Sequence, residues 1–292
     1  MGNINRCDST TTCEDGVELA VTIYQPSEAI KGAVLIGPAT GIKRQFYANF
    51  ANHLAELGFA VMTFDNRGIG GSLHSQIKHS LSSLQCWGQK DMPAMLTQLM
   101  THFPNTTYHL IGHSAGGQLV GLMPNADNLT SMFNVACSSG SLRNMKGVHA
   151  IRAQFFMNVF LPLCNAVFGH TKSQWVGMGE PLPKKVARQW QQWCNGQGYV
   201  KEAFGKTVHQ HYYDELAMPS MWVNAIDDEI AIDENVDDMI SVFPRLPTQK
   251  LTLTPSEYGL DEIGHMKFFS RKSQMLWGHS TDWLNKHSVD NQ

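Results

Sequence analysis

The segment Gly112-His113-Ser114-Ala115-Gly116 limits the possible folds of this chain more than any other stretch. It follows the apolar run 108–111 and precedes a helix-compatible run at 116–123, so it predicts a strand, a sharp turn and a helix. In a G-x-S-x-G turn the bend is so tight that side chains two residues either way would collide with the serine, which explains the glycines. Ser114 is therefore a candidate nucleophile, and a glycine-rich turn with a solvated serine is the simpler alternative.

A serine hydroxyl becomes a useful nucleophile only if a histidine accepts its proton and a carboxylate orients that histidine. The C-terminal half offers both partners in the order acid, then histidine. A buried-strand pattern at 220–226 is followed by Asp227 and Asp228, and His265 lies on a loop near the chain end. In such loops the acid comes three positions after a small residue, here Ala225, so Asp228 is preferred and Asp227 stays open. The same loop offers two further carboxylates, Glu229 and Asp233.

Acyl transfer to a serine also needs two backbone N–H groups that face the oxygen that becomes negative. One is the N–H of Ala115, directly after the candidate nucleophile. The second is expected from the loop after an early strand-like run at 33–36, where small residues let the backbone approach a substrate. Thr40 is the preferred donor in that loop and Ala39 is the alternative, because the sequence does not fix the register of the loop.

Several short segments rich in glycine or in candidate site residues follow one another along the chain. They are Gly37-Pro38-Ala39-Thr40-Gly41, Phe64-Asp65-Asn66-Arg67-Gly68-Ile69-Gly70-Gly71-Ser72, Gly112-His113-Ser114-Ala115-Gly116-Gly117, Asp228 and Gly264-His265. In this order they resemble the signature of the α/β-hydrolase superfamily over nearly the whole chain. More narrowly, they resemble bacterial predicted α/β hydrolases related to serine aminopeptidases and monoglyceride lipases, where an Ala-Thr-Gly or similar loop replaces the common His-Gly oxyanion motif. The resemblance implies hydrolysis of an ester, thioester or amide through an acyl-serine intermediate, without cofactor or metal.

Strand-like and helix-like runs alternate along the chain, which predicts an α/β-hydrolase fold: a mostly parallel twisted sheet with helices on both faces. The turn at 14–16 before the run 17–24 predicts an antiparallel hairpin at the N-terminus. From 142 to 218 the alternation gives way to aromatic, helix-like sequence. We therefore predict a helical cap, or lid insertion, at 142–218 and a core domain formed by 1–141 and 219–292.

An apolar run at 154–168 lies within the predicted lid. Because Asn158, Pro162 and Asn165 interrupt it and it is too short to span a bilayer, we expect no stable membrane insertion. Its residues could instead line an acyl pocket or dock on a membrane surface. The simpler alternative, that most of these residues pack the lid onto the core, stays open.

Charge and cysteine content exclude some classes of protein. A formal net charge of −3 provides no basic surface for nucleic acid phosphates. Six cysteines without a C-x-x-C pair, and a polar N-terminus without a signal-like apolar core, predict a cytoplasmic protein with reduced thiols. The spacing of His209 and His211 fits a metal pair, but no supporting ligand pattern accompanies it, so we expect no metal. Arg67 is expected to be structural, and nothing in the sequence indicates the oligomeric state.

We thus expect Ser114 to attack a carboxylic ester or thioester of a small-molecule acyl substrate. The aromatic lid indicates a medium or long acyl chain, as in a lipase or lysophospholipase. Amide or peptide hydrolysis, or acyl transfer, in the same site is the nearest alternative; an aminopeptidase would need carboxylates in the lid, which has few, chiefly Glu180 and Glu202. The alternative from another class is a non-catalytic ligand-binding protein on the same fold.

Overall fold

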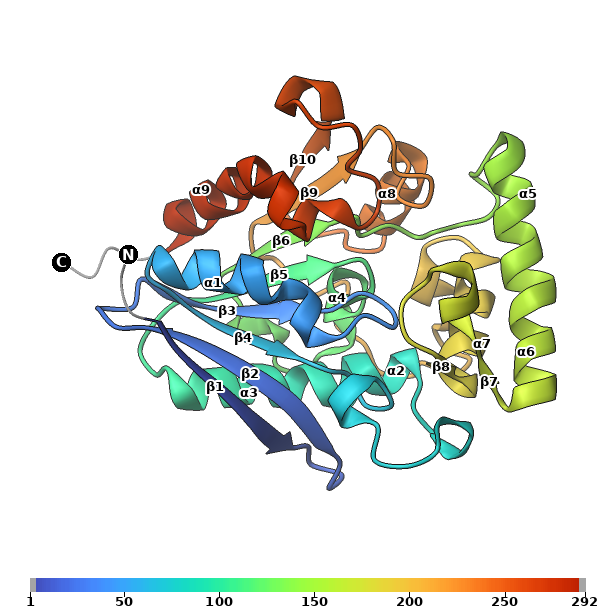
Figure 1. Ribbon diagram of the computed structural model, residues 1–292, viewed down its shortest axis with the longest axis horizontal. Coiled ribbons are helices and arrows are strands. Elements are labelled where there is room, and N and C mark those ends of the chain that lie inside the picture. The colour runs from blue at the N-terminus through green and yellow to red at the C-terminus, as the bar shows by residue number, and fades with distance from the viewer. Residues whose placement is uncertain (1–3, 289–292) are drawn as a thin grey trace.

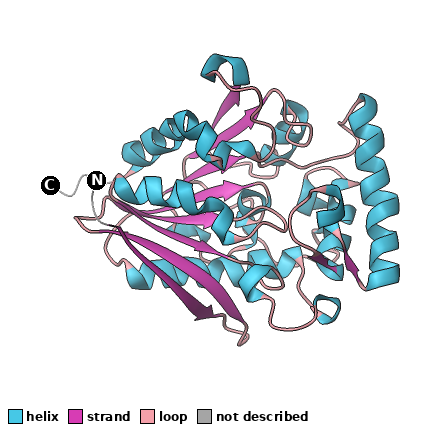
Figure 2. Cartoon of the chain, in the orientation of Figure 1, coloured by secondary structure: helices cyan, strands magenta, loops and turns pink. Residues whose placement is uncertain are grey.

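The computed structural model describes residues 4–288 and contains an eight-stranded sheet in the order β1-β2-β4-β3-β5-β6-β9-β10 (Figures 1 and 2). Strands β4, β3, β5, β6, β9 and β10 are parallel to their neighbours in this row, β1 and β2 form an antiparallel hairpin at one edge, and β2 is antiparallel to β4. The predicted mostly parallel sheet and N-terminal hairpin are confirmed. The strands are β1 Ile4–Thr12, β2 Glu18–Pro26, β3 Gly32–Gly37, β4 Phe59–Phe64, β5 Tyr108–His113, β6 Ser131–Val135, β9 Ser220–Ala225 and β10 Thr248–Leu253.

Helices cover both faces of the sheet, as predicted. On one face α1 and α9 lie together, with the rings of Phe50 and Trp277 5.3 Å apart, and α3 lies on the other face (Figure 1). Because both faces are covered, the central strands are continuous apolar runs without alternation, and Val34, Leu35 and Ile36 are fully buried. The helices of the core are α1 Ala48–Glu56, α2 Leu84–Cys86, α3 Met92–His102, α4 Ala115–Gln118, α8 Asp233–Ile240 and α9 Trp277–His287.

The helix predicted at 116–123 is shorter than expected. It consists of α4 and a separate 3-10 turn at Val120–Leu122. Glycine is a poor helix former, and Gly121 lies against the ring of Tyr213, where a Cβ would come within 2.4 Å of the ring. Close packing of Tyr213 therefore decides the local backbone there, and a single-sequence pattern does not reveal it.

Residues 142–218, called the insertion below, join β6 to β9 and lie beyond the carboxyl ends of the parallel strands, at the right of Figure 1. One long helix, Gly147–Phe168, runs along its outer side. A second helical part follows after a segment that contains Gly177, Gly179 and Pro181, residues that are typical of helix ends and turns. The elements are α5 Gly147–Phe155, the π-helical turn η7 Phe156–Phe160, α6 Leu161–Phe168, β7 His170–Thr171, β8 Leu182–Pro183 and α7 Lys184–Cys194.

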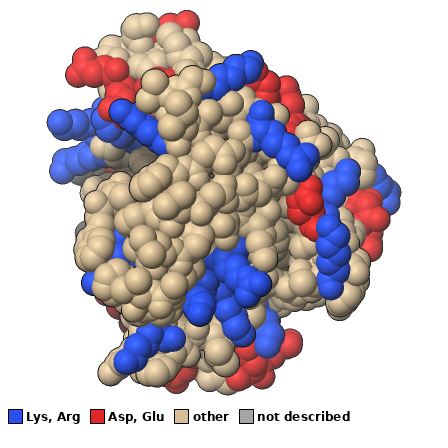
Figure 3. Space-filling view, turned by 90° about the vertical axis from the view of Figure 1, so that its right-hand side faces the viewer, with Lys and Arg blue, Asp and Glu red and all other residues tan. Residues whose placement is uncertain are grey.

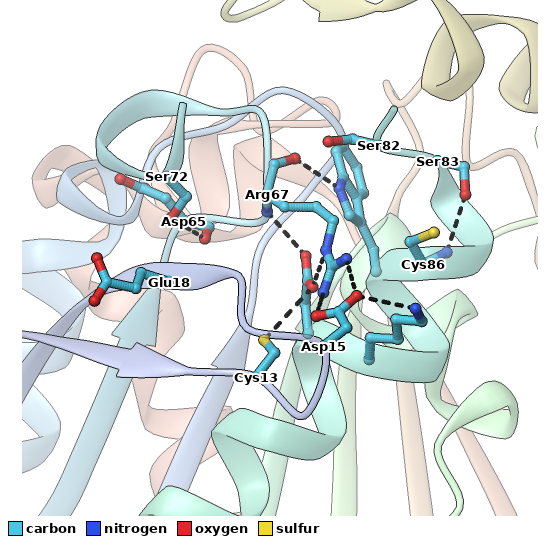
Figure 4. A network of polar contacts seen from close by, with 12 residues as sticks. Cys13, Asp15, Glu18, Asp65, Arg67, Ser72, Ser82, Ser83 and Cys86 are labelled. Carbon is cyan, nitrogen blue, oxygen red and sulfur yellow. Dashed lines mark hydrogen bonds and ion pairs between the residues drawn. The ribbon is translucent and has the colours of Figure 1, made fainter. Parts of the chain in front are cut away.

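The glycine-rich loop after β4 is held by a buried polar network (Figure 4). The Arg67 guanidinium donates to Asp91 and, at 2.7 Å, to Asp15, and Trp87 Nε1 donates to the Arg67 carbonyl at 3.0 Å. Lys90 also reaches Asp15, at 2.9 Å. Arg67 thus fixes the loop to the hairpin and to the start of α3, in agreement with the structural role that the sequence predicted.

Candidate active site

Ser114 occupies a strained turn between β5 and α4. Its φ of 49° and ψ of −114° lie where residues other than glycine are rare. The flanking glycines are required, but the collisions differ from those expected. A Cβ on Gly116 would lie 2.0 Å from the Gly37 carbonyl oxygen, and one on Gly112 would lie 2.5 Å from the Gly117 backbone. The neighbouring strand and helix, rather than the serine itself, exclude larger residues.

The structure brings Asp228 and His265 together from loops after β9 and β10. His265 Nδ1 lies 2.9 Å from Asp228 Oδ2, and the Asp228 side chain is fully buried. Asp228 Oδ1 accepts the N–H groups of Ile230 and Ala231, each at 2.8 Å. Burial alone would raise the pKa of Asp228, but the His265 imidazole and these N–H groups hold it below its usual value.

An ionised Asp228 defines the tautomer of His265. A carboxylate only accepts hydrogen bonds, so His265 Nδ1 carries the proton, and in the neutral imidazole Nε2 has a free lone pair. That lone pair is what a base needs to accept the proton of a serine hydroxyl. Ser114 and His265 line the same cavity.

Asp227, the alternative acid, has a different position. Its carboxylate accepts the N–H groups of Ile263 and Gly264, at 2.9 and 3.0 Å. Asp227 therefore anchors the loop that carries His265, while its neighbour Asp228 contacts the imidazole. The two adjacent carboxylates hold the same loop through different groups.

The two candidate oxyanion donors of the β3 loop differ in their hydrogen bonding. The N–H of Ala39 donates to Tyr47 Oη at 2.9 Å, so it is already engaged. Thr40, the next residue, lines the cavity together with Ser114. Ala115 begins α4, where the first N–H groups of a helix have no partner within the helix. The engaged amide of Ala39 favours the pair Ala115 and Thr40.

A buried chain of hydrogen bonds connects the β3 loop to the His265 loop. Tyr47 Oη lies 2.8 Å from His113 Nδ1, and His113 Nε2 lies 2.9 Å from the carbonyl oxygen of His265. A carbonyl only accepts, so Nε2 carries the proton, Nδ1 accepts from the Tyr47 hydroxyl, and that hydroxyl accepts from the amide of Ala39. The chain therefore has one direction, from Ala39 through Tyr47 and His113 to His265.

The side chains of Tyr47 and His113, which form this chain of hydrogen bonds, are both fully buried. Burial lowers the pKa of His113 to about 3, so the imidazole stays neutral, as the hydrogen bonds require. Tyr47 was missed, because an aromatic residue at the start of a core helix looks the same in sequence whether or not its hydroxyl has a partner.

Two adjoining cavities lie between the core and the insertion. The smaller, of about 190 Å³, is lined by Ser114, His265 and Thr40. The larger, of about 460 Å³, is mainly apolar and lies under α5. Both are lined by Met178, Trp190, Cys194, Ile230 and Gly140, so the larger cavity extends the space beside Ser114.

Within residues 4–288, no group of three or more His, Cys, Asp or Glu side chains is placed to hold a metal ion. His211, one of the two histidines with metal-like spacing, stacks on Phe204 with the ring centroids 3.8 Å apart. Its Nδ1 lies 3.6 Å from Asp214. His211 is thus part of an aromatic cluster.

Comparison with known families gives a match to the serine aminopeptidase S33 family over residues 28–192, more than half of the chain. The chain belongs to this family. The match includes the β3 loop, the turn at Ser114 and much of the insertion. No curated protein matches the chain significantly.

Solved structures of the same fold include several hydrolases. A soluble variant of monoglyceride lipase from Saccharomyces cerevisiae, solved with a substrate analogue, has a TM-score of 0.69 at 12% identity and covers 99% of this chain and 96% of its own. A thermophilic esterase from Thermogutta terrifontis has a TM-score of 0.58 at 15% identity, with 98% and 100% covered. An esterase from Pyrococcus furiosus has 0.62 at 13% identity, with 98% and 91% covered. At these identities the likeness shows the α/β-hydrolase fold alone.

Proposed function

We propose that this member of the S33 family is a serine hydrolase that cleaves a carboxylic ester or thioester of a medium or long acyl chain, in the manner of a lipase or lysophospholipase. The observation that carries the proposal is an oriented Asp228–His265 pair on the same cavity as Ser114, whose backbone is held in a strained turn. Esterases and a monoglyceride lipase among the proteins of this fold support an ester as the substrate.

In the proposed reaction Ser114 Oγ bonds to the carbonyl carbon while His265 Nε2 takes the hydroxyl proton. The carbonyl oxygen becomes an oxyanion that accepts the N–H groups of Ala115 and Thr40. The bond to the leaving oxygen or sulfur then breaks, and the leaving group takes the proton from Nε2. Water attacks the acyl-serine with the same base, which releases the acid and restores the serine. Asp228 stays ionised and stabilises the imidazolium.

The cavities support an acyl substrate. Together they form a mainly apolar space that begins at Ser114 and continues under α5. Apolar cavities of a few hundred Å³ with a small number of polar groups at one end are typical of small-molecule sites. The polar end here is the one with Ser114 and His265.

Amide or peptide hydrolysis is the second candidate, because the family carries the name of an aminopeptidase. A site for a substrate ammonium group would need a carboxylate at the cavity. Glu180 instead pairs with Lys43 at 2.8 Å, and Glu202 accepts the N–H of Gln197. Glu229 lines the larger cavity but lies 2.8 Å from His149. The carboxylates of this region are thus engaged, which favours an uncharged acyl substrate.

The decisive test is labelling with a fluorophosphonate probe, which reacts with an activated serine. We expect stoichiometric labelling that Ser114→Ala abolishes while the thermal unfolding curve stays unchanged. A panel of chromogenic esters graded by chain length, with a thioester and an aminoacyl amide, then ranks the substrates. No labelling of well-folded protein would contradict a serine hydrolase and favour a ligand-binding role. If the aminoacyl amide is cleaved faster than the esters, and Glu229→Gln removes that activity, the results would favour an aminopeptidase.

A further inference from the structure

The insertion carries most of the exposed apolar side chains of the molecule. Thirteen large hydrophobic side chains are exposed in the part of the chain described, and nine of them lie between residues 148 and 176. Six of the nine follow one line along the long helix and are 48% to 70% exposed. These six, called the apolar stripe below, are Val148, Ile151, Phe155, Val159, Leu163 and Val167, of which Phe155 also lines the larger cavity.

The helix is built so that the stripe stays on one side. On an α-helix, each step of four residues rotates the side chain by about 40° beyond one full turn. Between residues 151 and 167, this rotation alone would move the stripe residues off one face of the helix. The π-helical turn at Phe156–Phe160 adds one residue to a turn and offsets much of this drift. The 22 residues of Gly147–Phe168 thus present an apolar line about 33 Å long.

The opposite side of the helix is attached to the protein. Met157, Leu161 and Cys164 are buried there, and Asn158 exchanges hydrogen bonds with Asn195 at 3.0 and 3.1 Å. By length and composition alone, Gly147–Phe168 is long and apolar enough to cross a membrane. Crossing would detach Asn158 and expose it to lipid, which is costly. The attachment therefore favours a helix that lies along a surface.

The part of the insertion around the stripe is also basic. Residues 143–188 contain seven Lys and Arg and one Glu, a formal charge of +6 in a chain whose net charge is −3. The single acid, Glu180, pairs with Lys43, and Lys146 pairs with Glu234 of the core at 3.2 Å. Figure 3 looks onto this side of the molecule and shows a wide uncharged band bordered by groups of Lys and Arg, several of which have Asp or Glu beside them. The seven cations are Arg143, Lys146, Arg152, Lys172, Lys184, Lys185 and Arg188.

At one end of the stripe, exposed apolar side chains lie directly beside a cation. Lys172 Nζ lies 4.2 Å from the ring centre of Phe168 and 4.5 Å from that of Trp175. Trp175 is 59% exposed, although a tryptophan is large and apolar. Amphipathic aromatic rings beside a cation are typical of groups that lie at the boundary between lipid headgroups and acyl chains.

We propose that the apolar stripe docks this protein on the surface of an anionic lipid bilayer. The stripe enters the boundary between headgroups and acyl chains, and the surrounding Lys and Arg side chains contact the lipid phosphates. A second copy of the chain is disfavoured as the occupant, because two segments of charge +6 would face each other. Docking does not depend on the proposed hydrolysis, so it can be tested separately.

Flotation with sealed vesicles tests the proposal, using the full-length protein and vesicles of phosphatidylcholine alone or mixed with phosphatidylglycerol. We expect the protein to float with the mixed vesicles, to bind phosphatidylcholine at least severalfold more weakly, and to be released by added salt. Ile151→Asp and Leu163→Asp should each weaken binding about tenfold, because they place a carboxylate against lipid. Met275→Asp is the matched control: Met275 is 52% exposed on η12 (Arg271–Leu276), away from the insertion.

The results of these measurements distinguish a lipid surface from a second copy of the chain as the partner of the stripe. Loss of flotation in both stripe variants, with unchanged thermal unfolding and an unchanged Met275→Asp variant, supports docking on lipid. No flotation with either vesicle overturns the proposal, as does binding that Leu163→Asp leaves unaltered. A lipid-free dimer that Leu163→Asp dissociates would assign the stripe to a second copy and also overturn it. Hydrolysis is not measured, so a failure of the proposed function leaves these results intact.

Discussion

The edge of the core that carries Ser114 and His265 and the outer face of the insertion differ in how their side chains are buried. At the edge, Asp228 is buried and each of its oxygens accepts a hydrogen bond, and Tyr47 and His113 are buried in a directed chain. On the insertion, Ile151 and Leu163 are mostly exposed. Fixed geometry at the edge requires saturated polar contacts away from water. An apolar surface left exposed makes sense only if something outside the chain covers it.

The largest effect that we expect separates the two adjacent carboxylates of the edge. Asp228→Asn should lower kcat about 10⁴-fold, because an amide can donate to Nδ1 and favours the wrong tautomer of His265. Asp227→Asn should cost far less, about tenfold, since it only loosens the loop that carries His265. Steady-state kinetics on the best ester of the panel measure both, with thermal unfolding as the control for folding. Equal losses would contradict the assignment of Asp228 as the acid.

Gly116→Ala should give the next largest effect, on folding. Its Cβ would lie 2.0 Å from the Gly37 carbonyl, so the β3 loop and the Ser114 turn must separate, at a cost of about 3 kcal/mol or more in the free energy of unfolding. Gly278→Ala in α9 is the control. No atom lies within 4 Å of its Cβ, and alanine should stabilise that helix by about 0.5 to 1 kcal/mol. Urea denaturation measures the free energy of unfolding of both variants. A well-folded, active Gly116→Ala protein would contradict the tight contact between Gly116 and Gly37.

Tyr47→Phe tests whether the buried chain positions the site. The change leaves His113 Nδ1 and the Ala39 amide without a partner, so we expect kcat to fall about ten- to hundredfold with little change in KM. A role in packing alone would lower stability and leave kcat unchanged. Tyr24→Phe is the control, as Tyr24 is equally buried in β2. The rate of fluorophosphonate labelling reports the same effect directly at Ser114.

Much of the edge could be predicted because its signals are local. The turn at Ser114 has glycines at fixed positions, and Asp228 follows a strand whose apolar run marks its end. The choice of Asp228 over Asp227 depended on spacing from Ala225, and the structure places Asp228 at His265. Thr40 was preferred over Ala39 without the reason that the structure adds, because the partner of the Ala39 amide is a hydroxyl on another element.

The insertion was harder to read from sequence. One interpretation of its apolar run at 154–168 was packing on the core for most positions, but four residues of the run, Phe155, Val159, Leu163 and Val167, are mostly or half exposed. A helical pattern with apolar residues on two sides does not reveal which side faces the protein. The π-helical turn, which decides the line of the stripe, also has no pattern in one sequence. Tertiary contacts determine both which side of the helix is buried and where the π-helical turn lies.

The pH dependence of stability tests whether His113, at this edge, is buried in its neutral form. Folded His113 stays neutral down to about pH 3, whereas in the unfolded chain it takes up a proton near pH 6.5. Unfolding therefore binds a proton between these values, and stability is full above pH 6.5 and falls as the pH decreases. His113→Gln should reduce this slope by up to about 1.4 kcal/mol per pH unit. Urea denaturation at several values between pH 7 and pH 5 measures it, and an identical slope in the variant would contradict a neutral His113.

The smallest expected effect concerns the stability contributed by the stripe. Leu163→Ser should change the free energy of unfolding by no more than about 0.5 kcal/mol, because the side chain is already in water. Leu54→Ala in α1, where the leucine is fully buried, should cost about 2 to 5 kcal/mol. Urea denaturation of the two variants side by side compares the regions directly. A loss above about 2 kcal/mol in Leu163→Ser would mean that the stripe packs against this chain, and the opposition between edge and insertion would disappear.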